Sequence, residues 1–328
     1  MICLSLLLTV AASTPFGEPP PEKGVSLGLF ASDPKYDYDH FLKEISETGA
    51  THVSLVWVWW QENVFATKIH SKDGWSATRS QLERTIAQAK KRGLHVTAFP
   101  IVRLVKADAG DWRGKIRPTN EDAWWESYFA YIAHTASIAD QSGANRLVIG
   151  SELVSREGMR KRWLRLIERI RLRHPQLELM YSANWDHYEP VRFWDAVDHI
   201  GITGYWEVGR YNSGSVNELR EAWIPEINKL RSWSDKIKRP IIITEIGYPS
   251  LDSGTKFPWD ETRKAKLDLS TQSRGYRAAA YSFSDQAFLD GLYWWNWFGF
   301  GGAKDSNYTP RDKPAAEIIK SWYLIREP

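Results

Sequence analysis

The sequence has 328 residues, and its 43 lysines and arginines against 40 aspartates and glutamates give a formal net charge of +3. This length accommodates either two average domains or one large α/β barrel. The near balance of charge argues against a disordered chain and against a nucleic-acid-binding protein with a basic stripe. The single cysteine, Cys3, excludes an intramolecular disulfide framework and a cysteine-built metal site.

The amino-terminal residues predict export. Residues 1–13 are apolar and uncharged, and a proline-rich stretch follows them. This pattern is typical of a secretory signal, and the apolar run is too short for a membrane anchor. The positively charged start of such signals is missing, which indicates a truncated or misassigned first residue. We therefore expect a signal peptide at 1–17, a proline-rich leader at 18–24 and one catalytic domain at 25–328.

The rest of the chain has no candidate membrane helix. No later apolar run approaches the roughly 18 residues that a membrane-spanning helix needs. We therefore expect a mature protein that is soluble, without a membrane partner, and secreted or periplasmic.

Short apolar runs after residue 24 predict eight β-strands. Several of them are nearly continuous in valine, isoleucine, leucine and aromatic residues, as expected of parallel strands buried on both faces. The predicted strands lie at 25–30, 52–60, 94–102, 146–153, 177–185, 199–206, 240–248 and 291–298.

Longer amphipathic patterns between these runs predict helices, at about 82–92, 125–142, 164–174, 217–233, 259–284 and 315–324. Eight strands, each followed by a helix and without internal repeats, predict a single (β/α)₈ TIM barrel. A doubly wound open sheet competes with this prediction. It usually has fewer strands and a glycine-rich first turn, whereas Asp33 and Pro34 follow the first strand here.

Two glutamates stand at ends of predicted strands, where barrel enzymes carry their chemistry. Glu152 ends the fourth strand and Glu245 ends the seventh. Burying a carboxylate directly after an apolar strand is costly unless the charge is paired or used. One such glutamate alone is explained more simply as a helix cap or a rim ion pair. Two at opposing positions across a barrel mouth are expected to converge, which suits glycoside hydrolysis with one protonated and one ionised carboxyl group.

Aromatic residues also gather at the predicted strand ends, in a chain with 18 Trp, 14 Tyr and 12 Phe. About half of them should point outward into the core, because side chains alternate along a strand. The others should ring the mouth, where flat indole faces match the C–H face of a sugar ring. Nucleobases also stack on aromatic rings, but the basic residues cluster on the helix pattern near 160–173. We therefore expect a saccharide partner and no nucleic acid.

The chain resembles glycoside hydrolase family 113, within clan A of the retaining glycoside hydrolases. The resemblance extends over about residues 25–326. It is carried by VWWQEN at 58–63, DWRGKIRP at 111–118, WWESY at 124–128, GSEL at 150–153, TEIGYPS at 244–250 and YWWNW at 293–297.

This resemblance implies a retaining endo-β-1,4-mannanase acting on a polysaccharide or oligosaccharide. Glu152 would be the acid/base and Glu245 the nucleophile, with Tyr205 bound to the nucleophile. Either Trp295 or Trp297 would form the floor of the sugar subsite beside the cleaved bond. Further expected substrate contacts are Trp60, Arg103, Trp112, Asn184 and Trp185.

One residue departs from the clan pattern. Ser151 stands where many clan A enzymes have an asparagine that contacts the sugar 2-hydroxyl group. That contact strengthens in the transition state, so another donor should replace it. Asn184 and Arg103 are the two candidates.

Several other kinds of site have no motif in the sequence. There is no H-E-x-x-H zinc motif, no G-x-S-x-G nucleophile elbow and no P-loop. His52, His95 and His199 stand at strand starts, at the barrel face opposite to catalysis. We therefore expect neither a metal nor a cofactor. The open alternatives are another β-glycanase or exo-β-glycosidase of clan A, or a catalytically silent carbohydrate-binding barrel. The oligomeric state is not predicted.

Overall fold

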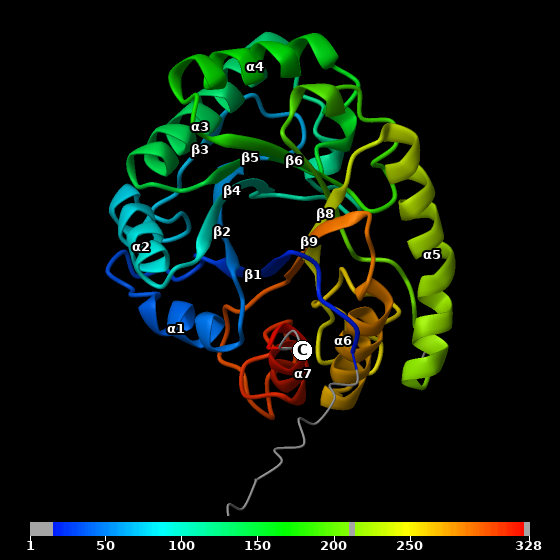
Figure 1. Cartoon of the computed structure of the whole chain (residues 1–328). Helices are drawn as coiled ribbons and strands as arrows, with labels where there is room; N and C mark the ends of the chain where they lie inside the picture. The colour runs from blue at the N-terminus through cyan, green and yellow to red at the C-terminus, as the bar shows by residue number, and fades with distance from the viewer. Residues whose placement is uncertain (1–15, 210–213, 325–328) are drawn as a thin grey trace, which may run out of the picture.

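The computed structural model describes residues 16–209 and 214–324. Eight parallel strands form a closed barrel with helices around it (Figure 1), which confirms the predicted TIM barrel. The strands pair in the order β1-β9-β8-β7-β6-β5-β4-β2, and β1 also pairs with β2, which closes the ring. The barrel strands are β1 (Glu22–Gly28), β2 (His52–Gln61), β4 (His95–Leu104), β5 (Arg146–Ser151), β6 (Glu178–Ala183), β7 (His199–Thr203), β8 (Ile241–Ile246) and β9 (Leu289–Trp294).

The two-residue strand β3 (Ile69–His70) lies outside this ring and pairs antiparallel with the end of β2. Seven α-helices lie in the described parts of the chain. They are α1 (Asp39–Glu47), α2 (Arg79–Lys91), α3 (Glu121–Gln141), α4 (Arg160–Arg173), α5 (Val216–Ile237), α6 (Leu269–Phe283) and α7 (Pro314–Tyr323). Capping boxes at Thr78 and Ser215 fix the starts of α2 and α5, because each satisfies two free backbone N–H groups.

The barrel begins earlier than its sequence pattern suggests. Strand β1 starts at Glu22, where it pairs with Gly291 of β9, so residues 22–24 of the predicted leader are part of the barrel. Residues 1–15 of the predicted signal peptide lie outside the described residues.

Two helix predictions are wrong in detail. No α-helix connects β6 to β7. The connection instead contains the short 3₁₀ helix η3 (Trp194–Ala196), and the indole N–H of Trp194 donates to the Tyr188 carbonyl at 2.9 Å. The helical pattern at 259–284 yields a helix only from Leu269, where the Asp268 side chain caps the start of α6. An isolated bridge between Leu251 and Leu267 closes a loop just before this helix.

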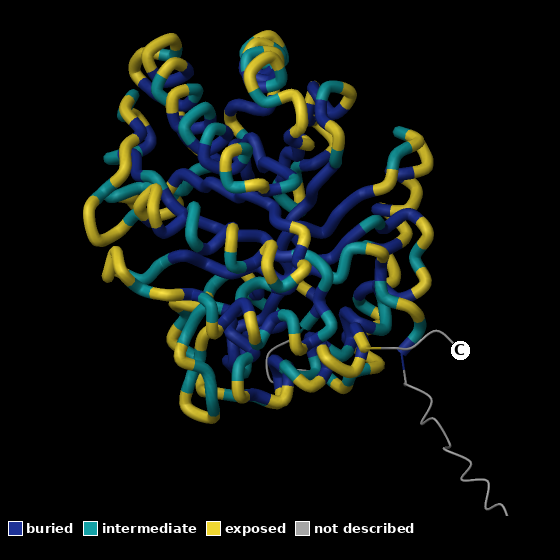
Figure 2. The backbone as a smooth tube through the Cα atoms, turned by 60° about the vertical axis from the view of Figure 1, so that its left-hand side comes forward, coloured by how far each residue is buried: buried dark blue, intermediate teal, exposed yellow. Residues whose placement is uncertain are grey.

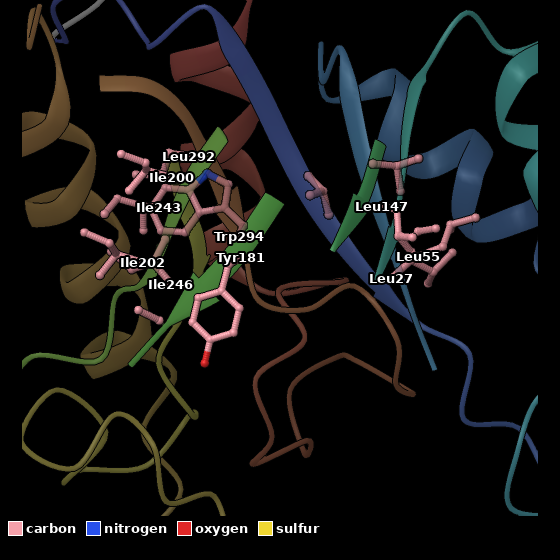
Figure 3. Close-up of a cluster of buried hydrophobic side chains, with 14 of the residues drawn as sticks. Leu27, Leu55, Leu147, Tyr181, Ile200, Ile202, Ile243, Ile246, Leu292 and Trp294 are labelled. Carbon is pink, nitrogen blue, oxygen red and sulfur yellow. The ribbon is translucent and has the colours of Figure 1, made fainter. Parts of the chain in front are cut away.

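The core has two layers, which follow from the alternation of side chains along each strand. Outward-facing residues pack beneath the helices. Figure 3 shows part of this layer, with Leu27, Leu55 and Leu147 on one side and Ile243 and Trp294 on the other. Inward-facing residues form a separate cluster inside the barrel, made of Val56, Val58, Trp60, Phe99, Ile101, Val148, Met180, Ile242 and Tyr293. In Figure 2 the strands are buried and most exposed positions lie on helices and loops.

Paired charges close the amino-terminal end of the barrel. Arg146 donates to both carboxylate oxygens of Glu22, at 2.7 and 2.9 Å, and the Tyr293 hydroxyl donates to Glu22 at 2.7 Å. His52 stacks on His95 beside them, with ring centroids 4.8 Å apart. This end is therefore filled, and the loops at the opposite end are free to build a site. Among the described residues, no helix has the length and apolar character to cross a membrane.

Candidate active site

Glu152 follows β5 in an unusual backbone conformation. Its φ angle is +52°, a left-handed value that residues other than glycine rarely adopt. The pairing of β5 with β6 shifts register between Val148 and Ser151, and the Glu152 N–H then donates to the Ser182 carbonyl at 2.8 Å. Such strained positions persist only when neighbouring contacts fix them, and they are frequent in active sites.

Arg113 binds Glu152 from the loop after β4. It lies in the 3₁₀ helix η1 (Arg113–Lys115), and its Nη2 donates to Glu152 Oε2 at 2.6 Å. Its Nε also donates to the Ser151 carbonyl at 3.3 Å. The two side chains are only 20% and 8% exposed, so water screens this ion pair weakly.

Glu245 lies near the end of β8 and is 3% exposed. The Tyr205 hydroxyl, just after β7, donates to Glu245 Oε2 at 2.9 Å. The other carboxylate oxygen, Oε1, accepts no hydrogen bond from the described residues. Tyr205 therefore orients the carboxyl group through one of its two oxygens.

The two glutamates interact electrostatically with each other and with Arg113. Burial raises the pKa of Glu245, and the negative charge of Glu152 raises it further, while Arg113 and the Tyr205 hydrogen bond oppose this rise. Burial disfavours the Arg113 cation, but the charges of Glu152 and Glu245 outweigh it and raise the pKa of Arg113. Arg113 therefore stays cationic beside both carboxyl groups.

A buried relay supports the segment that carries Glu152. The Leu153 N–H donates to the Tyr181 hydroxyl at 3.1 Å, and this hydroxyl donates to Glu157 Oε1 at 2.7 Å. The other oxygen of Glu157 lies 2.7 Å from His187 Nδ1. Burial raises the pKa of Glu157, and its hydrogen bonds with Tyr181 and His187 oppose that rise. The residue after Glu152 is thus tied to β6 and to the loop that follows it.

Of the two predicted subsite tryptophans, Trp295 faces the barrel interior. It packs against the interior cluster that contains Trp60. Gly247 permits the close approach, because a Cβ at that position would lie 2.1 Å from the Trp295 carbonyl oxygen. Trp297 points outward instead. Its indole N–H donates to Glu44 of α1 at 2.7 Å, and its ring is part of the outer core. Trp297 therefore lies in the outer core and not against the interior cluster that Trp295 contacts.

Trp185 and Asn184 follow β6. Trp185 stacks on Trp259, with ring centroids 6.0 Å apart and planes 20° apart, and Trp206 meets Trp185 edge-on at 6.1 Å. Asn184 donates its amide to Asp186. Trp185, Trp206 and Trp259 thus form an aromatic group after β6 and β7.

Arg103 and Trp112 occupy the ends of β4 and its loop. The Arg103 guanidinium lies 5.7 Å from the centroid of the Trp60 ring and has no carboxylate partner among the described residues. Burial and the positive charge of Arg113 lower its pKa, while Glu261 opposes this. Trp112 packs its ring on Gly114, where a Cβ would lie 2.4 Å from ring atoms. Both candidates to replace the missing asparagine keep a donor: Arg103 has no carboxylate partner among the described residues, and Asn184 uses one of its two amide hydrogens on Asp186.

Three residues at or near the site were not among the predicted site residues. Arg113 lies in the DWRGKIRP stretch that carries the family resemblance, so its position was visible but its contact with Glu152 was not. Trp259 falls in a segment expected to be helical. Glu157 has no distinguishing pattern in the sequence, because its role depends on Tyr181, 24 residues away. The Ser151 hydroxyl is buried and has no hydrogen-bond partner among the described residues.

Comparisons with known proteins bear on what this site does. The sequence model of Glycoside Hydrolase Family 113 matches residues 30–311, most of the chain. The chain belongs to glycoside hydrolase family 113. It is therefore a glycoside hydrolase, and the family resemblance expected from the sequence is confirmed. Comparison with curated proteins found no significant match.

Solved structures of family 113 have the same fold. The β-mannanase AaManA from Alicyclobacillus acidocaldarius, in complex with ManMIm, is 23% identical with a TM-score of 0.82, and the alignment covers 95% of this chain and 99% of that one. A complex of a family 113 β-1,4-mannanase gives the same identity and TM-score, covering 94% and 100%. A β-D-glucuronidase from Dictyoglomus thermophilum is more distant, at 14% identity and a TM-score of 0.63, covering 94% of this chain and 51% of that one.

Proposed function

We propose that this family 113 protein is a retaining endo-β-1,4-mannanase, with Glu152 as the general acid/base and Glu245 as the nucleophile. One observation carries the proposal. Two buried glutamates stand at the ends of the fourth and seventh barrel strands, at the same end of the barrel, and each has a fixed partner, Arg113 or Tyr205. Carboxyl pairs of this kind hydrolyse glycosidic bonds. The β-1,4-mannanase structures with the same fold support mannan as the substrate.

In the first step, Glu245 attacks and Glu152 donates. The free Oε1 of Glu245 bonds to the anomeric carbon while the bond from that carbon to the glycosidic oxygen breaks. Glu152 gives its proton to the departing oxygen, which leaves as a hydroxyl group. The products are a glycosyl ester on Glu245 and a shortened chain with a new non-reducing end.

In the second step, water replaces Glu245. Glu152, now a carboxylate, takes a proton from water as the water oxygen bonds to the anomeric carbon. The ester bond to Glu245 breaks and returns that carboxylate. Two inversions at the anomeric carbon give overall retention.

The two carboxyl groups have different surroundings before substrate binds. Without substrate, Arg113 pairs with Glu152, while burial and Glu152 raise the pKa of Glu245. The proposed chemistry requires the proton on Glu152 and the charge on Glu245. We infer that bound substrate favours this distribution of proton and charge. A glycosidic oxygen beside Glu152 accepts a hydrogen bond from its protonated form, and the positive charge developing at the anomeric carbon stabilises the Glu245 carboxylate.

A substrate panel tests the function. The protein should release reducing ends from β-1,4-mannan in preference to xylan, cellulose and chitin, and proton NMR should show the β-anomer as the first product. Release only from another glycan would shift the assignment to a different β-glycanase. Binding without release from any glycan would indicate a silent carbohydrate-binding barrel and would contradict the proposal.

Chemical rescue tests the two roles. Glu152→Ala should impair substrates with poor leaving groups far more than aryl β-mannosides, and azide should restore turnover of the aryl substrates. Glu245→Ala should lose turnover of both. The two roles would be reversed if Glu245→Ala, and not Glu152→Ala, still turned over the aryl substrates and azide accelerated that turnover.

A further inference from the structure

An exposed tryptophan stands beside the barrel mouth, in the turn after β3. Trp75 is 59% exposed, and the turn is ordered by hydrogen bonds from the Trp75 and Ser76 N–H groups to the Lys72 carbonyl, at 2.9 and 2.8 Å. The ring of Trp60 meets Trp75 at 89° with centroids 5.6 Å apart. The Lys72 ammonium lies 4.6 Å from the Trp75 ring centroid. The indole is therefore held in place while its surface remains in water.

This tryptophan is continuous with the candidate active site. Trp60 is a member of the interior cluster against which Trp295 packs. Arg103 lies over Trp60 and is close enough to Arg113, the partner of Glu152, for their charges to interact. Trp75 thus contacts Trp60, which belongs to the interior cluster against which Trp295 also packs.

A second exposed tryptophan lies on another flank of the mouth. Trp259 is 42% exposed and stacks on Trp185, which in turn contacts Trp206. Phe257 meets Trp259 edge-on at 5.9 Å. The loop that carries these residues is closed at its base, because the Asp252 N–H donates to the Lys266 carbonyl at 2.9 Å.

The strand order places the two groups across the barrel from each other. Trp60 lies at the end of β2 and Trp75 follows β3, whereas Trp185 follows β6 and Trp206 follows β7. In the closed ring β7 is four strands from β2 in either direction, so the two lie on opposite sides of the mouth. The glutamate pair at the ends of β5 and β8 lies between these flanks.

We propose that Trp75 and Trp259 are platforms of two outer sugar subsites, one on each side of the glutamate pair. Each would stack a neutral hexopyranose ring of a chain that runs across the mouth, with Lys72 and Arg103 as hydrogen-bond donors on the Trp75 side. Exposed, held indole faces match the C–H faces of such rings. This inference rests on the proposed function and deepens it, because a substrate held on both flanks is cut internally.

Chain-length dependence tests the two platforms. Trp75→Ala and Trp259→Ala should each lower kcat/KM for mannohexaose by roughly 10- to 30-fold, the effect of losing a well-placed aromatic contact. Each should leave an aryl β-mannobioside within about 3-fold of wild type, because a short substrate does not reach the outer subsites. The two variants should shift the cleavage pattern of mannohexaose toward opposite ends. Phenylalanine at either position should restore part of the loss.

A matched control and a binding measurement make the outcome decisive. Leu172→Ala removes another exposed apolar side chain, 81% exposed on α4, and should change nothing. Calorimetry in a Glu245→Gln background should show weaker mannohexaose binding when Trp75 or Trp259 is also replaced by alanine. Unchanged binding and an unchanged cleavage pattern would overturn the platforms. Failure of wild type to cleave mannan would instead overturn the proposed function, while the binding measurement would still decide the platforms.

Discussion

Tyr205 and Arg113 give the two glutamates different surroundings. Tyr205 donates a hydrogen bond to Glu245, and Arg113 forms an ion pair with Glu152. Two chemically identical side chains therefore have different partners, which suits the proposed roles of one carboxyl group as nucleophile and the other as acid.

The hydrogen bond from Tyr205 should matter for turnover more than for binding. A hydrogen bond to a charged group is worth about 1.5–3 kcal/mol, so Tyr205→Phe should lower kcat by roughly 10- to 150-fold. KM for mannan should change little. Tyr308→Phe is the matched control, since Tyr308 is buried nearby but donates to the Pro258 carbonyl. Equal losses in both variants would show that Tyr205 acts only through packing.

The buried Glu245 carboxyl should make stability depend on pH. Its pKa is raised in the folded protein, so its contribution to stability is fully present below the usual glutamate pKa and is lost as the pH rises through the raised value. Glu245→Gln keeps the neutral form at every pH. The Tm of wild type should therefore fall by a few degrees relative to this variant between about pH 5 and about pH 8.

Melting curves at a series of pH values measure this difference. Glu168→Gln, which replaces an exposed carboxyl group on α4, should follow wild type throughout. A Tm difference between wild type and Glu245→Gln that stays constant with pH would show that Glu245 does not hold its proton more tightly in the folded state.

The positions of single site residues differ in how far they could be predicted from the sequence. Glu152 and Glu245 could be predicted, because a carboxyl group directly after an apolar strand needs a reason to be there. The outward position of the Trp297 ring could not be predicted. The alternation of side chains is interrupted after β9, and only the hydrogen bond to Glu44 shows which way the ring turns. Arg113 could not be predicted either, because no pattern in its loop indicates that the loop folds back over β5.

At the scale of elements, the segment after β5 depends on β6. Tyr181 belongs to the outer face of β6, and Figure 3 shows its ring beside Ile202 and Ile246 with the hydroxyl directed away from these aliphatic side chains. That hydroxyl accepts from Leu153 and donates to Glu157. Strand β6 thus fixes the backbone of Leu153, the residue that follows Glu152.

Removing this hydroxyl should slow the reaction without weakening substrate binding. Tyr181→Phe leaves the Leu153 N–H without its partner and Glu157 with His187 alone, and the left-handed Glu152 is then less well held. We expect kcat to fall by about 10-fold or more at nearly constant KM, since small displacements of a catalytic group cost that much. The pH profile of kcat should also shift, because Glu157 lies close enough to Glu152 for their charges to interact.

Tyr323→Phe separates this effect from a general loss of stability. Tyr323 is also buried, and its hydroxyl donates to the Gly24 and Leu292 carbonyls in β1 and β9. This control should lower the denaturation midpoint and leave kcat and its pH profile unchanged. The same result for Tyr181→Phe would mean that the relay is only structural.

The elements themselves were largely predictable from apolar periodicity. All eight barrel strands lie where near-continuous apolar runs predict them, because parallel strands are buried on both faces. The prediction began this helix at Trp259, whereas α6 begins at Leu269 and is preceded by the loop that contains Phe257 and Trp259. They pack within a loop that Pro258 and the Leu251–Leu267 bridge keep out of helical conformation.

At the scale of the whole molecule, the two ends of the barrel differ in the residues that they carry. The amino-terminal end is filled by Arg146, Glu22 and the stacked histidines, while the other end carries the glutamate pair. Stability and activity should therefore be separable by mutation.

Arg146→Met should destabilise the protein but leave its chemistry intact. Arg146 is 6% exposed at its side chain, and its loss leaves Glu22 buried without a cation. Breaking a buried pair in this way costs about 3–5 kcal/mol in the free energy of unfolding. Denaturant titration should show this loss, and adding Glu22→Gln should recover part of it. A fall in kcat per folded molecule would contradict the separation of the two ends.

The glutamate pair is best tested by trapping the covalent intermediate. A 2-deoxy-2-fluoro-β-mannobiosyl fluoride slows both steps and should leave a glycosyl ester on the enzyme, which peptide mass spectrometry can locate. We expect the label on the peptide that contains Glu245, and no label on Glu245→Gln. A label on Glu152, or no label together with an inverted product, would contradict the assignment.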